Sequence, residues 1–258
     1  MNYIGIDIGS TCAKTVVLNK KKELILEFVQ PTGWSSVDTA EEIRQKLELS
    51  GINLSDDSSC CVATGYGRIS VPYADKTVTE ITCHALGAVH LFQHPDLTVI
   101  DIGGQDTKII QIEQGFVKDF IMNDKCAAGT GRFLEVMANT LSLRPNEMFD
   151  LARLGSDTTI SSMCTVFAES EVIGLIGKGE PKENIAYAVV NSTIRKVAAQ
   201  VSRMNGEMFT FCLTGGLCEC DYIREALSKE LGKDVFSCPD ARYAGAIGAA
   251  ISAMKVRR

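Results

Sequence analysis

Hydrophobic and polar positions form the same pattern twice in this chain: a short apolar run, a tight polar turn and a second apolar run. Residues 4–18 read IGIDIGSTCAKTVVL, and residues 98–112 read TVIDIGGQDTKIIQI. Short apolar runs bounded by glycine and small polar residues predict buried strands joined by a turn. The two segments align without a gap at an offset of 94 residues, the separation of Asp7 from Asp101. This internal repeat predicts two similar halves that face one another across a cleft.

The remaining pattern alternates strands with helices. Apolar runs predict strands, and apolar residues spaced three or four apart predict helices. The expected strands are residues 23–30, 60–64, 116–122 and 209–213, and the expected helices are residues 37–49, 79–92, 181–203, 221–231 and 243–254. Thr79 is a candidate N-cap of its helix. The alternation predicts an α/β fold, and no low-complexity linker interrupts it.

Composition narrows the classes of protein that remain. The chain has 258 residues, 45% of them hydrophobic, with a formal charge of −6, which argues against non-specific nucleic-acid binding. The N-terminus lacks the pattern of a signal peptide, and no run of 18 apolar residues would span a membrane. We therefore expect a cytoplasmic protein. Ten cysteines without an export signal favour metal or cluster binding by a subset over disulfides.

Two cysteines stand at the start of helical patterns. Residues 123–133 read NDKCAAGTGRF, so Cys126 precedes a glycine-rich turn that leads into an apolar helical pattern. Cys164 opens a second helical pattern. Helix N-termini present unpaired N–H groups and the positive end of the helix dipole. Thiolates placed there indicate that something anionic is held nearby.

The two hairpins have the composition of phosphate-binding turns, because glycines and small polar residues point N–H groups at anions. Asp7 and Asp101 are placed to orient Mg²⁺, through water. The later run from Leu213 to Leu217, LTGGL, is suited to close contact with an adenosine. No GxxxxGK[ST] motif occurs, so this is not a Walker A loop. The expected nucleotide-binding residues are Gly9, Ser10, Thr11, Lys14, Gly103, Gly104, Gln105, Gly215 and Gly216.

The paired hairpins, the Thr-Gly-Gly turn and the Ala- and Gly-rich C-terminal helix together resemble the superfamily of acetate kinase, sugar kinases, heat-shock ATPases and actin. This resemblance implies an α/β fold of two ribonuclease-H-like, actin-like lobes around a nucleotide cleft. We expect one lobe to comprise residues 1–94 with 240–258. The second lobe is expected to comprise residues 95–239 and to carry both cysteines named above.

A narrower resemblance covers nearly the whole chain. Five motifs are similar to those of the ATP-dependent activators of 2-hydroxyacyl-CoA dehydratases, a group that includes the ATPase subunits of benzoyl-CoA reductase. The motifs are TGYGR at residues 64–68, EITCHA at 80–85, DIGGQD at 101–106, NDKCAAGTGRF at 123–133 and CTVFAESEV at 164–172.

The resemblance implies cofactors, partners and roles. In that family a homodimer holds one 4Fe-4S cluster with two cysteines from each chain, and Cys126 and Cys164 match those positions. It further implies ATP/ADP with Mg²⁺, ferredoxin or flavodoxin as the electron donor, and an iron–sulfur acceptor enzyme in an anaerobic setting. Asp7 and Asp101 are expected to be needed for hydrolysis. Either Asp101 or the neighbouring Gln105 and Asp106 would orient the attacking water.

Several alternatives stay open at this point. The acceptor could be a double-cubane-cluster protein or benzoyl-CoA reductase, and a small-molecule kinase of the same superfamily is a further possibility. Cys218 and Cys220 form a CxC that could bind metal or be structural. Glu169 and Glu171 could serve an interface or a solvated helix face. The cysteines expected to be packing residues are Cys60, Cys61, Cys83 and Cys212.

Overall fold

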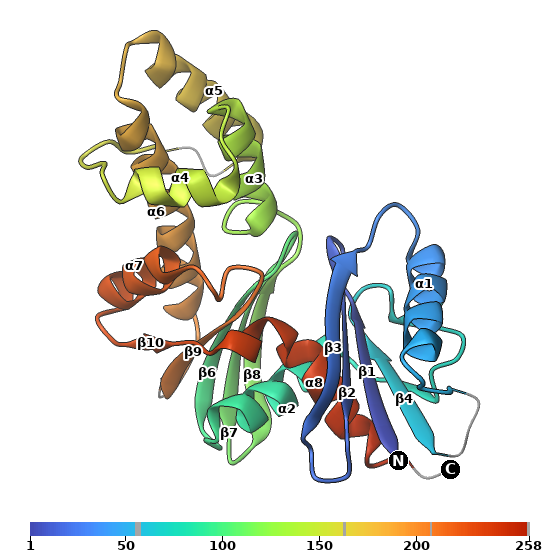
Figure 1. Cartoon of the computed structure of the whole chain (residues 1–258). Helices are drawn as coiled ribbons and strands as arrows, with labels where there is room; N and C mark the ends of the chain where they lie inside the picture. The colour runs from blue at the N-terminus through green and yellow to red at the C-terminus, as the bar shows by residue number, and fades with distance from the viewer. Residues whose placement is uncertain (55–57, 162–163, 207, 257–258) are drawn as a thin grey trace. The chain divides into compact units, whose positions relative to one another are not determined.

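The computed structural model describes residues 1–54, 58–161, 164–206 and 208–256 (Figure 1). Contacts between Cα atoms divide the chain into two units. The first comprises Met1–Val99, Ile110–Asp119 and Cys238–Arg258, and the second comprises Ile100–Ile109 and Phe120–Ser237. Within the described residues, no helix combines the length and the apolar character needed to cross a membrane.

Strands and helices alternate along the chain, which confirms the predicted α/β class. The strands are β1 (Asn2–Ile8), β2 (Cys12–Leu18), β3 (Leu24–Pro31), β4 (Ser59–Thr64), β5 (Lys76–Thr77), β6 (Leu97–Ile102), β7 (Thr107–Glu113), β8 (Phe116–Asn123), β9 (Thr210–Gly215) and β10 (Val235–Phe236). The α-helices are α1 (Ser36–Leu49), α2 (Glu80–Phe92), α3 (Gly131–Thr140), α4 (Pro145–Ala152), α5 (Thr165–Gly177), α6 (Lys182–Val201), α7 (Asp221–Leu231) and α8 (Ala244–Ala253). Short 3-10 turns lie at Arg68–Ser70 and Pro239–Tyr243.

The first sheet has the strand order β3-β2-β1-β4-β5 and is covered on both faces. β1 runs antiparallel to β2 and parallel to β4. Because successive side chains on a strand point to opposite faces, Ile4, Ile6 and Ile8 pack with α1, whereas Gly5 and Asp7 face α8. Both faces of β1 are therefore buried, which explains why residues 4–8 are apolar on both faces except at Asp7.

Helices α2 and α8 touch backbone to backbone beneath this sheet. A Cβ on Gly87 would collide with the carbonyl oxygen of Ala244, and one on Gly248 with that of Cys83. A Cβ on Gly5 of β1 would collide with the Ala246 carbonyl of α8. Glycines in β1, α2 and α8 thus let the three elements pack backbone against backbone, which restricts the side chains that lie between them.

The second sheet has the strand order β10-β9-β6-β7-β8. In the second unit α6 is the central helix, because it packs against α4, α7, α3 and α5. Its buried side chains recur at helical spacing, for example Ile185, Val189 and Val197. In this sheet, β6 ends just before Gly103 and Gly104, and β9 ends at Gly215. These glycines belong to the second half of the repeat.

Most of the predicted elements are confirmed, with ends shifted by a few residues. Thr79 is the N-cap residue of α2, although its hydroxyl bonds to the hydroxyl of Thr82 rather than to a backbone N–H. The sequence reasoning did not identify α4, β5 or β10. α4 has only eight residues, and its start lacks a usual N-cap residue. The available signals were Pro145 at its first position and Glu147, whose carboxylate accepts a hydrogen bond from the Arg144 N–H.

Candidate functional site

The first hairpin lies between β1 and β2. Its turn is closed by a hydrogen bond from the Gly9 N–H to the Cys12 carbonyl, at 3.1 Å. Ser10 and Thr11 are exposed at the tip, so their hydroxyls are accessible to a ligand. The buried Asp7 is the second-last residue of β1 and lies directly opposite Lys14 of β2. All of the residues that the sequence assigned to this hairpin are therefore gathered at one end of the first sheet.

A glycine turn after β4 supports the same hairpin. Gly65 has a φ of +85°, and a Cβ there would lie 2.5 Å from both Asp7 Oδ1 and the Ile8 carbonyl oxygen. The N–H of Gly67 donates to the Ile8 carbonyl at 2.9 Å. These two glycines hold the TGYGR turn against the aspartate, a role that the sequence reasoning did not assign to them.

The second hairpin, between β6 and β7, repeats this construction in the second unit. The Gly103 N–H donates to the Asp106 carbonyl at 2.9 Å, and Gln105 is exposed at the tip. Gly215 has the same φ of +85° as Gly65, and a Cβ there would lie 2.5 Å from the Ile102 carbonyl oxygen. The Gly216 N–H donates to that carbonyl at 3.1 Å. The internal repeat thus extends to the Thr-Gly turns that follow β4 and β9.

A buried charge network surrounds Asp101. Lys108 is 1% exposed, and its Nζ lies 3.3 Å from Asp101 Oδ2 and 2.7 Å from Asp106 Oδ2. The hydroxyl of Thr214 donates to Asp101 Oδ1 at 2.8 Å. A buried ammonium requires such partners, because burying an unpaired charge is costly. Asp101 and Asp106 are thereby fixed in position, whereas Gln105 extends into solvent.

We expect Lys108→Met to lower the free energy of unfolding by about 3 kcal/mol or more, because it leaves the buried Asp101 carboxylate without its cation. Chemical denaturation of both variants and the wild type measures this. Lys118→Met is the matched control, since Lys118 pairs with Glu113 on the surface, where such a pair contributes less than about 1 kcal/mol. Equal losses of unfolding free energy in Lys108→Met and Lys118→Met would contradict a stabilising role for the buried Lys108–Asp101 pair.

The loop that carries Cys126 is hydrogen-bonded to the second hairpin. The Gly131 N–H donates to the Gly103 carbonyl at 2.9 Å, and the Arg132 N–H donates to the Gly104 carbonyl at 2.7 Å. Behind the hairpin, the Thr107 hydroxyl donates to the Gly129 carbonyl at 2.6 Å. The start of α3 is therefore tied directly to the turn that the sequence assigned to phosphate binding.

The same loop is ordered around the cysteine itself. The Asn123 side-chain amide donates to the carbonyls of Cys126 and Ala128, at 2.8 and 3.1 Å. The Thr130 hydroxyl donates to the Ala127 carbonyl at 2.6 Å. Cys126 is half-buried, so its thiol is held on an ordered loop that remains accessible.

Cys164 is the N-cap residue of α5 and is exposed, which confirms the predicted start of a helix. α5 packs against α3, and the Thr140 hydroxyl of α3 donates to Glu169 of α5 at 3.1 Å. The Glu171 carboxylate accepts hydrogen bonds from the Ser161 N–H and hydroxyl, which ties Ser161 to α5. Both glutamates thus serve local structure within the second unit.

The cysteines other than Cys126 and Cys164 are either buried or half-buried. All ten are among the described residues, and none is in a disulfide. The predicted packing role of Cys60, Cys61, Cys83 and Cys212 is confirmed by their burial. Burial raises the pKa of the Cys83 thiol to about 12, so it stays protonated. Cys218 is buried and Cys220 is the N-cap residue of α7, and burial raises the pKa of the Cys220 thiol.

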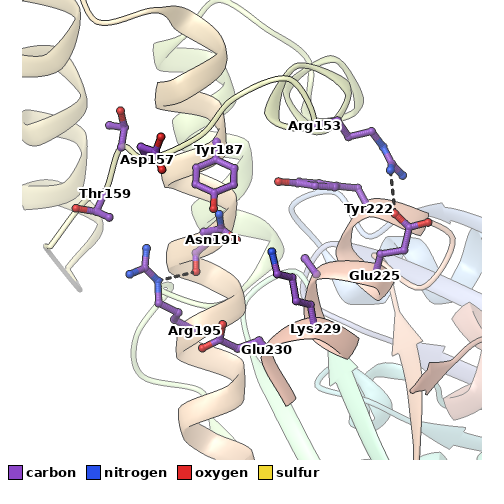
Figure 2. Close-up of a pocket in the computed structure, with 12 residues that line it drawn as sticks. Arg153, Asp157, Thr159, Tyr187, Asn191, Arg195, Tyr222, Glu225, Lys229 and Glu230 are labelled. Atoms are coloured by element: carbon purple, nitrogen blue, oxygen red, sulfur yellow. Dashed lines mark hydrogen bonds and ion pairs between the residues drawn. The ribbon is translucent and has the colours of Figure 1, made fainter. Parts of the chain in front are cut away.

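A polar groove of about 630 Å³ lies between α6 and α7 in the second unit (Figure 2). Tyr187 of α6 and Tyr222 of α7 project into it, and Arg153 pairs with Glu225 at 2.9 Å along one wall. Its lining residues include three basic and three acidic side chains, so the groove favours no ligand charge. The residues that the sequence assigned to nucleotide or cluster binding do not line it.

Comparison with known proteins gives one consistent result. A family model described as the BadF/BadG/BcrA/BcrD ATPase family matches residues 4–253. The (R)-2-hydroxyglutaryl-CoA dehydratase activating ATPase of Acidaminococcus fermentans is 42% identical over 98% of this chain and 96% of its own.

Solved structures agree with this result. The crystal structure of the A. fermentans (R)-2-hydroxyglutaryl-CoA dehydratase component A has a TM-score of 0.91 and 40% identity, covering 99% of this chain and 98% of that one. The activator of 2-hydroxyisocaproyl-CoA dehydratase from Clostridium difficile, with bound ADPNP, has a TM-score of 0.88 and 33% identity, covering 100% and 99%. The predicted actin-like α/β fold is confirmed by these similarities.

Proposed function

Because this chain belongs to the BadF/BadG/BcrA/BcrD ATPase family, we propose that it is an ATP-hydrolysing one-electron activator. It passes a low-potential electron from a 4Fe-4S cluster to an iron–sulfur partner enzyme of the 2-hydroxyacyl-CoA dehydratase class. The relatives named as dehydratase activators support the choice of partner. Ferredoxin or flavodoxin is the proposed donor, and the cytoplasmic location remains a prediction.

One observation carries the proposal. The turn assigned to phosphate binding and the loop that carries Cys126 share two backbone hydrogen bonds, from Gly131 to Gly103 and from Arg132 to Gly104. A change in the turn on nucleotide binding or hydrolysis therefore moves the start of α3 with it. A ligand shifts a conformational equilibrium only if it binds the alternative states differently. These hydrogen bonds supply a direct route from the nucleotide to the cysteine.

The donor set fits half of a cluster site. Cys126 and Cys164 are accessible thiols that precede α3 and α5, two helices in contact with each other. Thiolates are the usual ligands of a 4Fe-4S cluster, and such a site takes four. Two per chain imply a second copy of the chain related by two-fold symmetry. When bound, the cluster supplies one-electron chemistry, and the N-terminus of α5 favours its negative charge.

The hairpins divide the work of binding nucleotide. In the proposal, the N–H groups and hydroxyls of Ser10 and Thr11 hold phosphate oxygens, and Gly104 presents a further N–H group. The N–H groups of Gly9 and Gly103 close the two turns that present these groups. Asp7 and Asp101 orient hydrated Mg²⁺. Gln105, exposed at the tip of the second hairpin, orients the attacking water. Asp106 is instead held by Lys108 at 2.7 Å, so it supports the hairpin.

In the proposed function, ATP hydrolysis supplies the free energy for an uphill electron transfer. Each 59 mV of uphill potential costs a factor of ten in the equilibrium constant of a one-electron transfer. A very negative acceptor is therefore reduced only when another reaction supplies free energy.

The composition of the anaerobically purified protein tests the proposal. We expect iron and sulfide at about four each per two chains, and a native mass equal to two chains plus one cluster. Removal of iron with a chelator should release single chains that still bind ATP. An iron-free single chain that phosphorylates a small molecule would instead establish the kinase alternative.

A further inference from the structure

We propose that His84 is a positioning residue of the nucleotide site, and that it acts by holding the carboxylate of Asp7 in place for Mg²⁺. The inference rests on the proposed ATPase function, and it gives a role to the EITCHA motif at the start of α2. It lies entirely within the first unit.

The geometry places the imidazole between two carboxylates. His84 Nε2 lies 4.0 Å from Asp7 Oδ2 and 3.7 Å from Glu80 Oε1. His84 is 4% exposed and Asp7 is 2% exposed, so water does not screen them. An N–H on Nε2 faces carboxylate oxygens that can accept a hydrogen bond.

The backbone fixes this arrangement from three sides. Asp7 points from β1 toward α8, and His84 is carried by α2, whose backbone touches that of α8. At the meeting point lies Gly245, where a Cβ would be 2.5 Å from Asp7 Oδ2 and 3.0 Å from His84 Nε2. The glycine therefore leaves space that the carboxylate and the imidazole share.

Glu80 completes the set one helical turn before His84. It is partly exposed, with 25% of its side-chain surface accessible, so it links the buried pair to the surface of the unit. A carboxylate that binds the N–H of a histidine fixes the ring orientation. Residues that orient a metal-binding group in this way typically change metal affinity or activity by 10- to 100-fold when replaced.

The test measures the Mg²⁺ dependence of ATP hydrolysis by the full-length protein. We expect His84→Phe to raise the apparent Mg²⁺ constant about 10-fold or more, because the donor to Asp7 is lost. His84→Gln keeps an N–H donor near the position of Nε2, so it should recover most of the wild-type constant. His90→Phe and His90→Gln are the matched controls on the same helix, and both should behave as wild type.

Gly245→Ala probes the same contact from the other side. It should raise the Mg²⁺ constant as His84→Phe does, and combining the two should add little, because both break one interaction. Folding is followed by thermal unfolding of each variant. An unchanged Mg²⁺ constant in folded His84→Phe, or equal constants for His84→Phe and His84→Gln, would overturn the proposal. If the wild type itself hydrolyses no ATP, the proposed function fails instead.

Discussion

Cys126→Ala should yield a colourless protein with almost no iron when it is purified anaerobically. The wild type should carry about two iron atoms per chain, half of a four-iron cluster. The variant leaves one of the two proposed ligand thiols in each chain, and two thiolates from two chains cannot hold a cluster that takes four. The Asn123 amide donates to the backbone carbonyl of residue 126, which alanine keeps, so the loop should keep its structure.

A matched variant separates this effect from a general loss of cysteine. Cys220→Ala also removes a half-buried thiol at the start of a helix in the second unit, and it should retain its iron. Cys164→Ala should behave as Cys126→Ala does. Iron and sulfide assays with visible absorbance provide the measurement. Retention of iron by either Cys126→Ala or Cys164→Ala would refute the ligand assignment.

Asp101→Asn should lower the rate of ATP hydrolysis about 100-fold or more while leaving the iron content unchanged. The substitution keeps the shape of the side chain and an acceptor for Thr214, which donates to Oδ1 at 2.8 Å. Lys108 keeps its second partner, Asp106, at 2.7 Å. What is lost is the negative charge that we propose orients hydrated Mg²⁺.

Phosphate release from ATP, measured with saturating Mg²⁺, tests this expectation. Asp150→Asn removes one carboxylate from the exposed face of α4 and should leave the rate unchanged. Equal rates for Asp101→Asn and the wild type would reject the role of Asp101. A loss of iron together with activity would show that the aspartate serves folding of the second unit.

The repeat explains how much of the fold could be predicted from sequence. Asp7 and Asp101 recur with the same neighbours, so a local pattern identified both hairpins and the strands that flank them. Cys164 was also placed correctly at the start of a helix, because the apolar residues that predict this helix follow it closely in the sequence. These features depend on short stretches of chain, where periodicity and turn composition are informative.

The features that could not be predicted depend on contacts between distant residues. Nothing in the spacing of Gly103 and Gly131 indicates that their backbones are hydrogen-bonded. The role of Gly65 against Asp7 also depends on how β4 lies beside β1. The clue that was available is the Thr-Gly pair at residues 64–65, which matches Thr214-Gly215 in the other half of the repeat.

We propose that ATP drives an electron from this protein to its partner, and pre-steady-state electron transfer tests this step. The protein is reduced anaerobically and mixed with an oxidised 2-hydroxyacyl-CoA dehydratase, and the recovery of cluster absorbance is followed in a stopped-flow instrument. With Mg-ATP we expect rapid recovery and a reduced partner, and with Mg-ADP or no nucleotide we expect neither. Equal rates with and without ATP would contradict the account.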